Sequence, residues 1–286
     1  MRQPTACCAL TNELAHETIS HGRTAEESMD KFQCLKLEIR ADGVALLTLN
    51  RPEKLNSFNR VMIAEWDHVL DLVANDAGAK VLVLTGAGRA FCAGGDAGEI
   101  AEMQDADNIA RRNYLLGIHR IPLALERLDK PVIAAINGTA RGAGLDMSIM
   151  CDLRVAAASA TFAESYINMG LISGDGGMYF LPRLIGTARA LELLWTGRVV
   201  DAVEAERIGL VNRVVADADV LAEALKLAAA VAAQPQEAIR ITKRSVYQSM
   251  TNTLASHLDA VASHMAVLYD TPEFKARLKS FNERKK

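Results

Sequence analysis

The spacing of hydrophobic and polar residues changes several times along the chain, and each change predicts a new element. Residues 34–40 and 44–50 alternate apolar and polar side chains around an Asp-Gly pair, which predicts a β-hairpin. Residues 59–75 place their apolar side chains at helical spacing, and residues 80–86 return to a strand. The folded part of the chain therefore begins near Phe32 with the order strand, strand, helix, strand.

The same alternation continues through the middle of the chain and then gives way to helices. The predicted elements there are a helix over 106–128, a strand over 132–138, a helix over 145–152 and a strand over 153–163. From Thr187 onward, helical spacing dominates up to the C-terminus. Alternating strands and helices followed by helices alone indicate an α/β core with a helical C-terminal part. We divide the chain into a variable extension, this core and a helical C-terminal region, at residues 1–31, 32–215 and 216–286.

Two glycine-rich turns, each closing an apolar strand-like run, predict a functional site. They are VLVLTGAGRAFCAGGD, which ends at Asp96, and PVIAAINGTARGAGLD, which ends at Asp146. Small residues such as Ala93, Gly94 and Ala143 would let a substrate carbonyl reach backbone NH groups. The second turn leads into a helix, whose first NH groups are unpaired and carry partial positive charge. A single such turn is usually structural, but the pair predicts an oxyanion hole.

Composition excludes several other classes of protein. The net charge of −3 comes from 32 basic and 35 acidic residues without a long basic block, so we expect no nucleic-acid partner. The five cysteines form no CxxC pair, which predicts neither a zinc site nor a disulfide framework and favours the cytoplasm. We expect no signal peptide and no membrane span. A dinucleotide-binding turn at Gly86 and Gly88 is rejected because Phe91 replaces the third glycine.

An ordered series of motifs resembles the crotonase (enoyl-CoA hydratase/isomerase) superfamily from about residue 32 to the C-terminus. The motifs are LNRPEKLNSF, AFCAGGD, KPVIAAINGTARGAGLDMSIMCD, GLISGDGGMYFLPRLIG and TGRVVDAVEAERIGLVNRVV. The resemblance implies a spiral of ββα units, a helical C-terminal trimerisation region, and a homotrimer or a dimer of trimers. It also implies an acyl-CoA thioester substrate without a metal or other cofactor, whose carbonyl is bound by the NH groups of Ala93 and Ala143.

The acidic residues depart from the pattern of the family's hydratases. Those enzymes use two glutamates that flank one water, and the matching positions here hold Asp146 and Tyr166. Because tyrosine is a poor base near neutral pH, a second acid is needed, and Asp175 and Glu164 are the candidates. Some other family members place a working aspartate on the same loop, one position earlier, at Gly174. We expect Asp146 to act with one loop acid, while the Gly174 NH and Tyr166 position water or substrate.

Each of these residues also has a structural interpretation. Asp175 could cap the helix that follows it, and Asp146 could complement the macrodipole in the first turn of its helix. Glu164 is interpreted, by a small margin, as a solvated or paired loop residue. Cys92 is interpreted as a packing residue, and His119 as a surface or core histidine rather than a base.

The resemblance places the coenzyme A contacts less closely. It implies that main-chain groups around Ala93, Gly94 and Asp96 hold the adenine, and that basic residues meet the phosphates. Lys54 and Lys275 are the candidates, and each is equally well interpreted as an ordinary solvated lysine.

Three functions remain open from the sequence. The leading hypothesis is a lyase that adds water to a 2-enoyl-CoA. The second is isomerisation of an enoyl-CoA or dienoyl-CoA, or another enolate reaction of a CoA ester. The third is a CoA-ester-binding protein without catalysis, which the tyrosine at position 166 suggests.

Overall fold

A hairpin opens the folded part of the protein, as the sequence predicts. The computed structural model describes residues 32–284, so the variable extension expected over 1–31 lies outside the described residues. Strands β1 (Leu35–Ile39) and β2 (Val44–Leu49) pair antiparallel, and Gly43 makes the turn with a φ of +85°. Alternate side chains of β1 are buried, which explains the period of two in its sequence.

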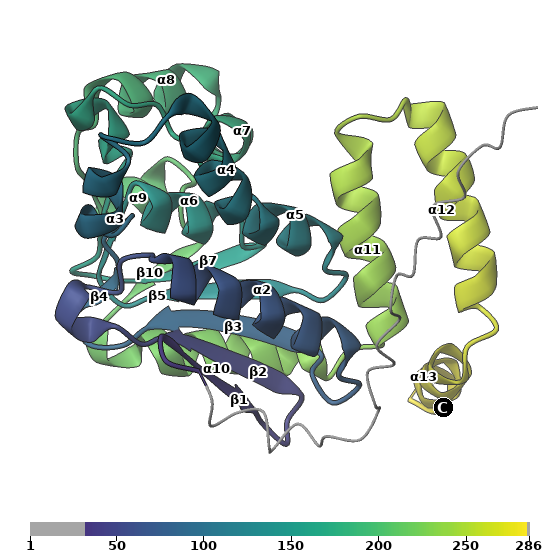
Figure 1. The fold of residues 1–286 in the computed structure, drawn as a ribbon. Helices are drawn as coiled ribbons and strands as arrows, with labels where there is room; N and C mark the ends of the chain where they lie inside the picture. Colours follow the sequence, from purple (N-terminus) through teal and green to yellow (C-terminus); the bar gives the residue numbers. More distant parts are fainter. Residues whose placement is uncertain (1–31, 285–286) are drawn as a thin grey trace, which may run out of the picture. The chain divides into compact units, whose positions relative to one another are not determined.

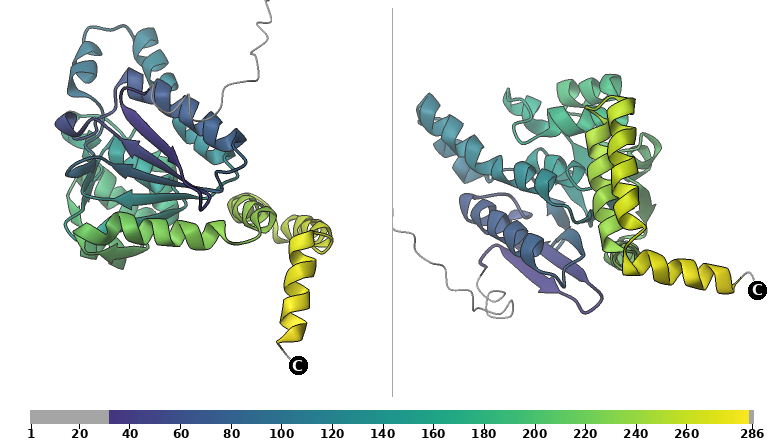
Figure 2. Two further views of the ribbon diagram at one scale, coloured as in Figure 1. Left: turned by 90° about the horizontal axis from the view of Figure 1, so that it is seen from below. Right: turned by 90° about the vertical axis from the view of Figure 1, so that its right-hand side faces the viewer.

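The hairpin belongs to a six-stranded sheet whose order is β1-β2-β3-β5-β7-β10. All strand pairs beyond the hairpin are parallel. Strands β3 and β5 are buried at every residue because helices cover the sheet, with α2 (Arg60–Asn75) on one face and α10 (Val220–Ala232) on the other (Figures 1 and 2). The added strands are β3 (Val81–Gly86), β5 (Val132–Ile136), β7 (Leu153–Ala157) and β10 (Arg213–Val215).

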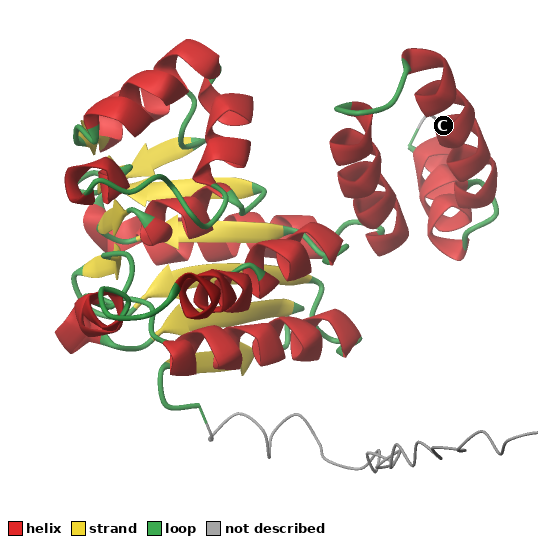
Figure 3. Ribbon diagram, turned by 45° about the horizontal axis from the view of Figure 1, so that its top comes forward, coloured by secondary structure: helices red, strands yellow, loops and turns green. Residues whose placement is uncertain are grey.

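A second, four-stranded sheet has the order β4-β6-β8-β9, and its strands β4 and β6 end at the turns of interest. Figure 3 shows the strands, in yellow, among the helices. The chain supplies one strand to each sheet in turn and then a helix, as in β3-β4-α3 and β5-β6-α6. This confirms the expected spiral of ββα units. The strand predicted over 153–163 is two strands, because a turn after Ala157 moves the chain between sheets. The short strands are β4 (Ala90–Cys92), β6 (Thr139–Arg141), β8 (Thr161–Ala163) and β9 (Val200–Asp201).

Helices follow the predicted order with two differences. The helix predicted over 106–128 is broken at His119 into α4 and α5, because Pro122 has no NH and crowds the carbonyl four residues earlier. A short helix, α3, follows Asp96 and was not predicted. The helices of the core are α2 (Arg60–Asn75), α3 (Ala97–Glu102), α4 (Asn108–Ile118), α5 (Arg120–Arg127), α6 (Ala143–Ile149), α7 (Gly177–Ile185), α8 (Thr187–Thr196) and α9 (Ala202–Arg207), with 3-10 turns η1 (Pro52–Lys54), η2 (Ser165–Met169) and η3 (Asp217–Asp219).

The C-terminal helices are α10 (Val220–Ala232), α11 (Gln236–Ser249), α12 (Leu254–Leu268) and α13 (Pro272–Glu283). Helix α10 packs on β2, β3, β5 and β7 of the large sheet. Helix α11 is joined to the core at Asp152, which contacts Lys243 Nζ at 2.8 Å and accepts a hydrogen bond from the Tyr247 hydroxyl. Helices α12 and α13 lie beyond α11, on the side of this unit opposite β4 (Figure 1).

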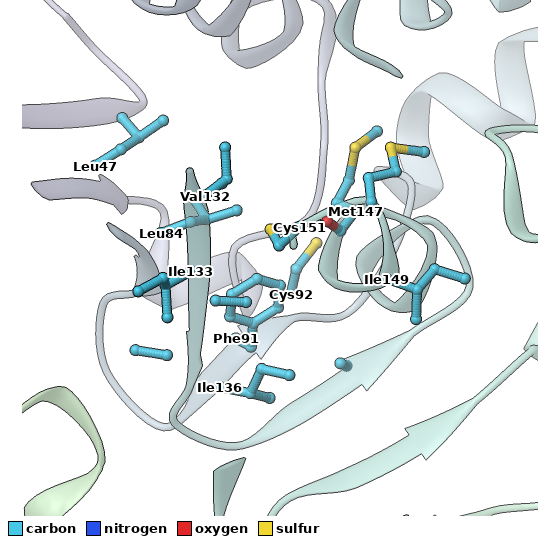
Figure 4. Close-up of a cluster of buried hydrophobic side chains, with 14 of the residues drawn as sticks. Leu47, Leu84, Phe91, Cys92, Val132, Ile133, Ile136, Met147, Ile149 and Cys151 are labelled. Carbon is cyan, nitrogen blue, oxygen red and sulfur yellow. Dashed lines mark hydrogen bonds between the residues drawn. The ribbon is translucent and has the colours of Figure 1, made fainter. Parts of the chain in front are cut away.

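The hydrophobic core fixes the position of the two glycine-rich turns. Phe91 and Cys92 of β4 are fully buried and lie between the strands and the helix that carries Met147 and Ile149 (Figure 4). Burial raises the pKa of Cys92 to about 12, so its thiol is neutral at physiological pH, in agreement with the predicted packing role. Because β4 and α6 share this core, the turns at their ends have little freedom to separate.

Candidate active site

The two glycine-rich turns contact each other through their main chains. A Cβ atom added at Gly144 would lie 2.2 Å from the carbonyl oxygen of Cys92, in the other turn. A Cβ at Gly94 would lie 2.9 Å from the Arg141 oxygen and 3.8 Å from the Ala143 nitrogen. Gly94 also has a φ of +106°, which other residues rarely adopt. Glycine at these positions therefore lets the two backbones meet.

One backbone NH in each turn has no hydrogen-bond partner among residues 32–284. In the first turn, this free NH is not the one that the sequence predicts. The Ala143 NH is at the first position of α6 and is free. The Ala93 NH donates to the Leu55 oxygen at 3.0 Å, so the prediction that Ala93 supplies a free donor is wrong. The free group in the first turn is the NH of Gly95. The main chain of Phe58 donates to the Gly94 oxygen and accepts from the Asp96 NH, so the Gly95 NH between them points away from Phe58.

The residues expected to bind coenzyme A are only partly brought together. The Asp96 carboxylate accepts hydrogen bonds from Arg51 Nη2 at 3.0 Å and from the Gly98 NH at 2.9 Å, and it caps α3. The Arg51 hydrogen bond also holds the Asp96 pKa below its usual range. Lys54 is exposed at the end of η1, close to the first turn in sequence. Lys275 is on α13, 3.6 Å from Asp270, and is not near the turns within one chain (Figure 1).

Asp96 is therefore a structural residue of the first turn, and its replacement tests this interpretation. We expect Asp96→Ala to lower the free energy of unfolding by about 1 to 3 kcal/mol, because it removes a helix cap and a partner of Arg51. Chemical denaturation measures this loss. A KM for the best CoA substrate that stays within about twofold of wild type is expected, whereas a large rise in KM with unchanged stability would return Asp96 to the binding site.

A cluster of buried acids lies next to the second turn. Asp146, Glu164 and Asp175 are at most 4% exposed, and they come from α6, the end of β8 and the loop before α7. Tyr166 Oη lies 2.8 Å from Asp146 Oδ2 and 2.9 Å from Asp175 Oδ2. Ser173 donates a third hydrogen bond, at 2.9 Å, to Asp146 Oδ2. The structure thus brings together acids that are up to 29 positions apart in the sequence.

The position of Tyr166 sets the minimum number of protons that the two aspartates hold. A phenol hydroxyl has one hydrogen, so it donates to one aspartate and must accept a hydrogen bond from the other. The accepting interaction requires a protonated carboxyl group. With both hydrogen bonds formed, at least one of Asp146 and Asp175 is therefore a carboxylic acid.

The pKa shifts agree with this proton count. Burial and the charge of Asp175 raise the pKa of Asp146 to about 6, against the hydrogen bonds from Tyr166 and Ser173. Burial also raises the pKa of Asp175, against the Tyr166 hydrogen bond and the nearby His119. Both shifts are in the direction that favours retention of a proton by the pair, as expected for carboxyl groups that interact in a dry site.

The structural alternatives for these acids can now be compared with the contacts. Asp175 is not a helix cap, because α7 is preceded by Gly176 and has no side-chain cap. Glu164 is not a solvated loop residue, because its exposed fraction is 1%. Asp146 does lie in the first turn of α6, but its carboxylate is bonded to Tyr166 and Ser173 rather than open to solvent.

His119 joins this cluster, which the sequence did not indicate. Its Nε2 lies 2.7 Å from the Gly174 oxygen, and since a carbonyl only accepts, that nitrogen carries the hydrogen. The break between α4 and α5 places the imidazole beside the loop that carries Asp175. No pattern of residues around His119 distinguishes it from an ordinary helical histidine.

Comparison with known proteins assigns the family. The family model described as enoyl-CoA hydratase/isomerase matches residues 39–286. The chain belongs to the enoyl-CoA hydratase/isomerase family. Membership confirms the resemblance noted in the motifs, and the observed spiral of ββα units is the fold of the family's solved structures.

Members of the enoyl-CoA hydratase/isomerase family with different names are similar to this chain. A Mycobacterium bovis protein named "Probable enoyl-CoA hydratase echA12" is 40% identical over 223 residues, or 76% of this chain and 78% of that protein. The 1,2-epoxyphenylacetyl-CoA isomerase of Escherichia coli is 36% identical and covers 84% of this chain and 92% of its own. The crystal structure of an enoyl-CoA hydratase from Bacillus anthracis superposes with a TM-score of 0.83 at 33% identity. The superposition covers 88% of this chain and 97% of the Bacillus anthracis chain.

Proposed function

We propose that this protein is an enoyl-CoA hydratase, which adds water across the C2–C3 double bond of a 2-enoyl-CoA thioester. The observation that carries the proposal is the Asp146–Tyr166–Asp175 set, two carboxyl groups joined by a hydroxyl, next to a free backbone NH. In this proposal one of the two carboxyl groups is ionised and the other is protonated. The Tyr166 ring lies 3.6 Å from the position a Cβ would take at Gly142, the residue before Ala143. Hydratases among the similar proteins support the same reaction.

The thioester carbonyl oxygen is bound in this proposal by the NH groups of Gly95 and Ala143. As water adds to C3, negative charge moves onto this oxygen, and two fixed donors stabilise the resulting enolate. One such donor contributes about 3 to 4 kcal/mol in sites of this kind. The partial positive charge at the start of α6 acts in the same direction, although that helix is short.

The acid set supplies the proton transfers of the reaction. Water loses one proton, through the Tyr166 hydroxyl, to the carboxylate, and its oxygen forms the new bond to C3. The carboxylic acid of the pair gives its proton to C2 of the enolate, which restores the thioester carbonyl. Tyr166 then passes a proton between Asp146 and Asp175, so that the pair again holds one proton.

A second candidate, double-bond isomerisation, is favoured by the position of the Tyr166 hydroxyl. It occupies the space between the two aspartates, where a hydratase of this family holds its water. A fixed hydroxyl can move protons between two carbons of a substrate but cannot itself be added to one. The similar proteins include one isomerase of a CoA thioester, the 1,2-epoxyphenylacetyl-CoA isomerase of Escherichia coli.

The assembly proposed for the protein is a homotrimer or a dimer of trimers. Large apolar side chains are exposed on the outer helices, including Leu254 at 73% and Leu258 at 55% on α12. Leu254 and Leu258 are four residues apart and so share one face of α12, and exposed apolar faces commonly mark interaction sites. Light scattering is expected to give a trimer or hexamer, and a monomer would contradict this proposal. The cytoplasmic location stays a prediction from the cysteine pattern.

Product analysis with two substrates tests the proposed reaction. Crotonyl-CoA and a 3-enoyl-CoA are incubated separately with the protein, and the products are separated by chromatography. Formation of 3-hydroxybutyryl-CoA from crotonyl-CoA is expected. Conversion of the 3-enoyl-CoA to the 2-enoyl-CoA without hydration would favour the isomerase, and binding of both without turnover would favour a binding protein.

A further inference from the structure

Glu164 is the one member of the acid cluster that the proposed reaction does not use. Its side chain is almost fully buried, and neither of its carboxyl oxygens has a hydrogen-bond partner in the described part of the chain when both are treated as acceptors. The groups that act on it are themselves acidic, namely Asp146 of α6 and Asp175 of the loop before α7. Burying a carboxylate without a donor or a cation is very costly, so this site favours the protonated form.

The position of Gly177 shows where the Glu164 proton can go. A Cβ atom added at Gly177 would lie 2.1 Å from Asp146 Oδ1 and 2.8 Å from Glu164 Oε1. The two acids therefore direct one oxygen each toward the space that this glycine leaves open. Asp146 Oδ1 also has no partner among residues 32–284 if Glu164 is ionised. A proton on Glu164 Oε1 gives this oxygen and Asp146 Oδ1 a partner through one hydrogen bond.

We propose that Glu164 is a positioning residue, which keeps its proton, donates it to Asp146 Oδ1 and so makes Asp146 the ionised member of the aspartate pair. Asp146 then accepts hydrogen bonds from Tyr166, Ser173 and Glu164, whereas among the described residues Asp175 is hydrogen-bonded to Tyr166 alone. A carboxylate has about four acceptor sites, so three donors suit Asp146 in its charged form. In the proposed reaction, Asp146 is then the base and Asp175 is the acid. These two roles, unlike the proton on Glu164, rest on the proposed function.

The electrostatics of the site favour the proton on Glu164. Burial first, and then the charge of Asp146, raise the pKa of Glu164 to about 10. The surrounding groups are Tyr166 and Ser173, which donate to Asp146, and His119, which lies beside Asp175. Among the described groups that shift the Glu164 pKa there is no cation that would favour its ionisation.

Thermal unfolding as a function of pH tests the proton on Glu164 without any substrate. Since the folded state holds this proton and the unfolded chain does not above about pH 4.5, the resulting stability is complete at low pH and is lost as pH rises toward 10. Glu164→Gln keeps a donor and removes the titration. We expect the melting temperature of Glu164→Gln, relative to wild type, to rise by at least about 3 °C between pH 5 and pH 9.

Kinetics of two variants test the positioning of Asp146. Glu164→Gln is expected to retain kcat within about fivefold and to leave the acidic limb of the kcat/KM profile in place. Glu164→Leu, which has no donor, is expected to move that limb to higher pH by about one unit, because Asp146 loses a hydrogen bond to its charged form.

Three results would overturn the inference. The first is a difference in melting temperature between Glu164→Gln and wild type that does not change with pH. The second is an acidic limb of the kcat/KM profile that stays in place in Glu164→Leu. The third is a loss of kcat in Glu164→Gln as large as the loss in Asp146→Asn. The last result would make Glu164 a proton donor to the substrate itself. If no CoA ester is turned over by wild type, the proposed function fails, while the melting experiment still decides the state of Glu164.

Discussion

Asp146→Asn is expected to lower kcat/KM for crotonyl-CoA by about 1000-fold or more. The amide oxygen still accepts hydrogen bonds from Tyr166 and Ser173, so the packing of α6 is preserved while the base is lost. General base catalysis contributes roughly 100- to 10,000-fold in enzymes, and Asp146 accepts the proton of the attacking water in the proposed reaction. Initial rates from pH 5 to pH 9, with melting temperatures as a folding control, measure the effect.

A matched control for this variant is present in the loop that follows the same helix. Asp152 also bears a partly buried carboxylate with several partners, the Val132 NH at 2.7 Å and Lys243 among them, but it faces α11 rather than the acid cluster. Asp152→Asn is expected to lower the melting temperature and leave kcat within about threefold. Asp175→Asn is expected to lower kcat/KM by less than Asp146→Asn does, but by more than this control. Wild-type rates in a folded Asp146→Asn protein would refute the mechanism.

Ala143→Pro is expected to lower kcat by about 100- to 1000-fold. The substitution removes the only hydrogen of one oxyanion-hole donor, and loss of one donor has an effect of this size in comparable sites. Proline is accepted at the first position of a helix, where the NH makes no intrahelical bond, so α6 is expected to remain folded. Steady-state kinetics with the best CoA substrate, supported by melting temperatures, measure the loss.

Ala143→Gly is the control for this change, because it keeps the NH and alters only the side chain. We expect its kcat to stay within about threefold of wild type. A folded Ala143→Pro protein whose kcat fell by less than tenfold would show that the carbonyl oxygen is bound elsewhere.

Local periodicity predicted the elements whose environment is uniform along their length. The alternation in β1 and β2 and the helical spacing of α2 survive in the structure because each has one buried face. The break at His119 could have been predicted from Pro122, whereas α3 could not, because that short helix has no buried residues to give it a pattern.

The errors at the site come from contacts between distant segments. The donor assigned to Ala93 is used by Leu55, a pairing that depends on how residues 55–58 lie along the first turn. Nothing within the turn itself distinguishes the Ala93 NH from the Gly95 NH. The composition of that turn therefore predicted the presence of a hole, but not which group forms it.

The roles of the acids could not be predicted from the sequence for the same reason. Asp146, Asp175 and Glu164 were all identified as candidates, since each lies near a glycine-rich loop. Their roles depend on burial and on the Tyr166 hydroxyl between the two aspartates, and both are properties of the assembled fold. Glu164 was interpreted as a loop residue because no local pattern indicates that three segments close over it.

The most direct test of the account is to follow crotonyl-CoA in water labelled with both deuterium and 18O, using mass spectrometry of the isolated product. The wild-type protein is predicted to form 3-hydroxybutyryl-CoA with one 18O at C3 and one deuterium at C2, and Asp146→Asn is predicted to form almost none. Unchanged crotonyl-CoA in the presence of folded wild-type protein, or a product without 18O at C3, would contradict the proposed hydration.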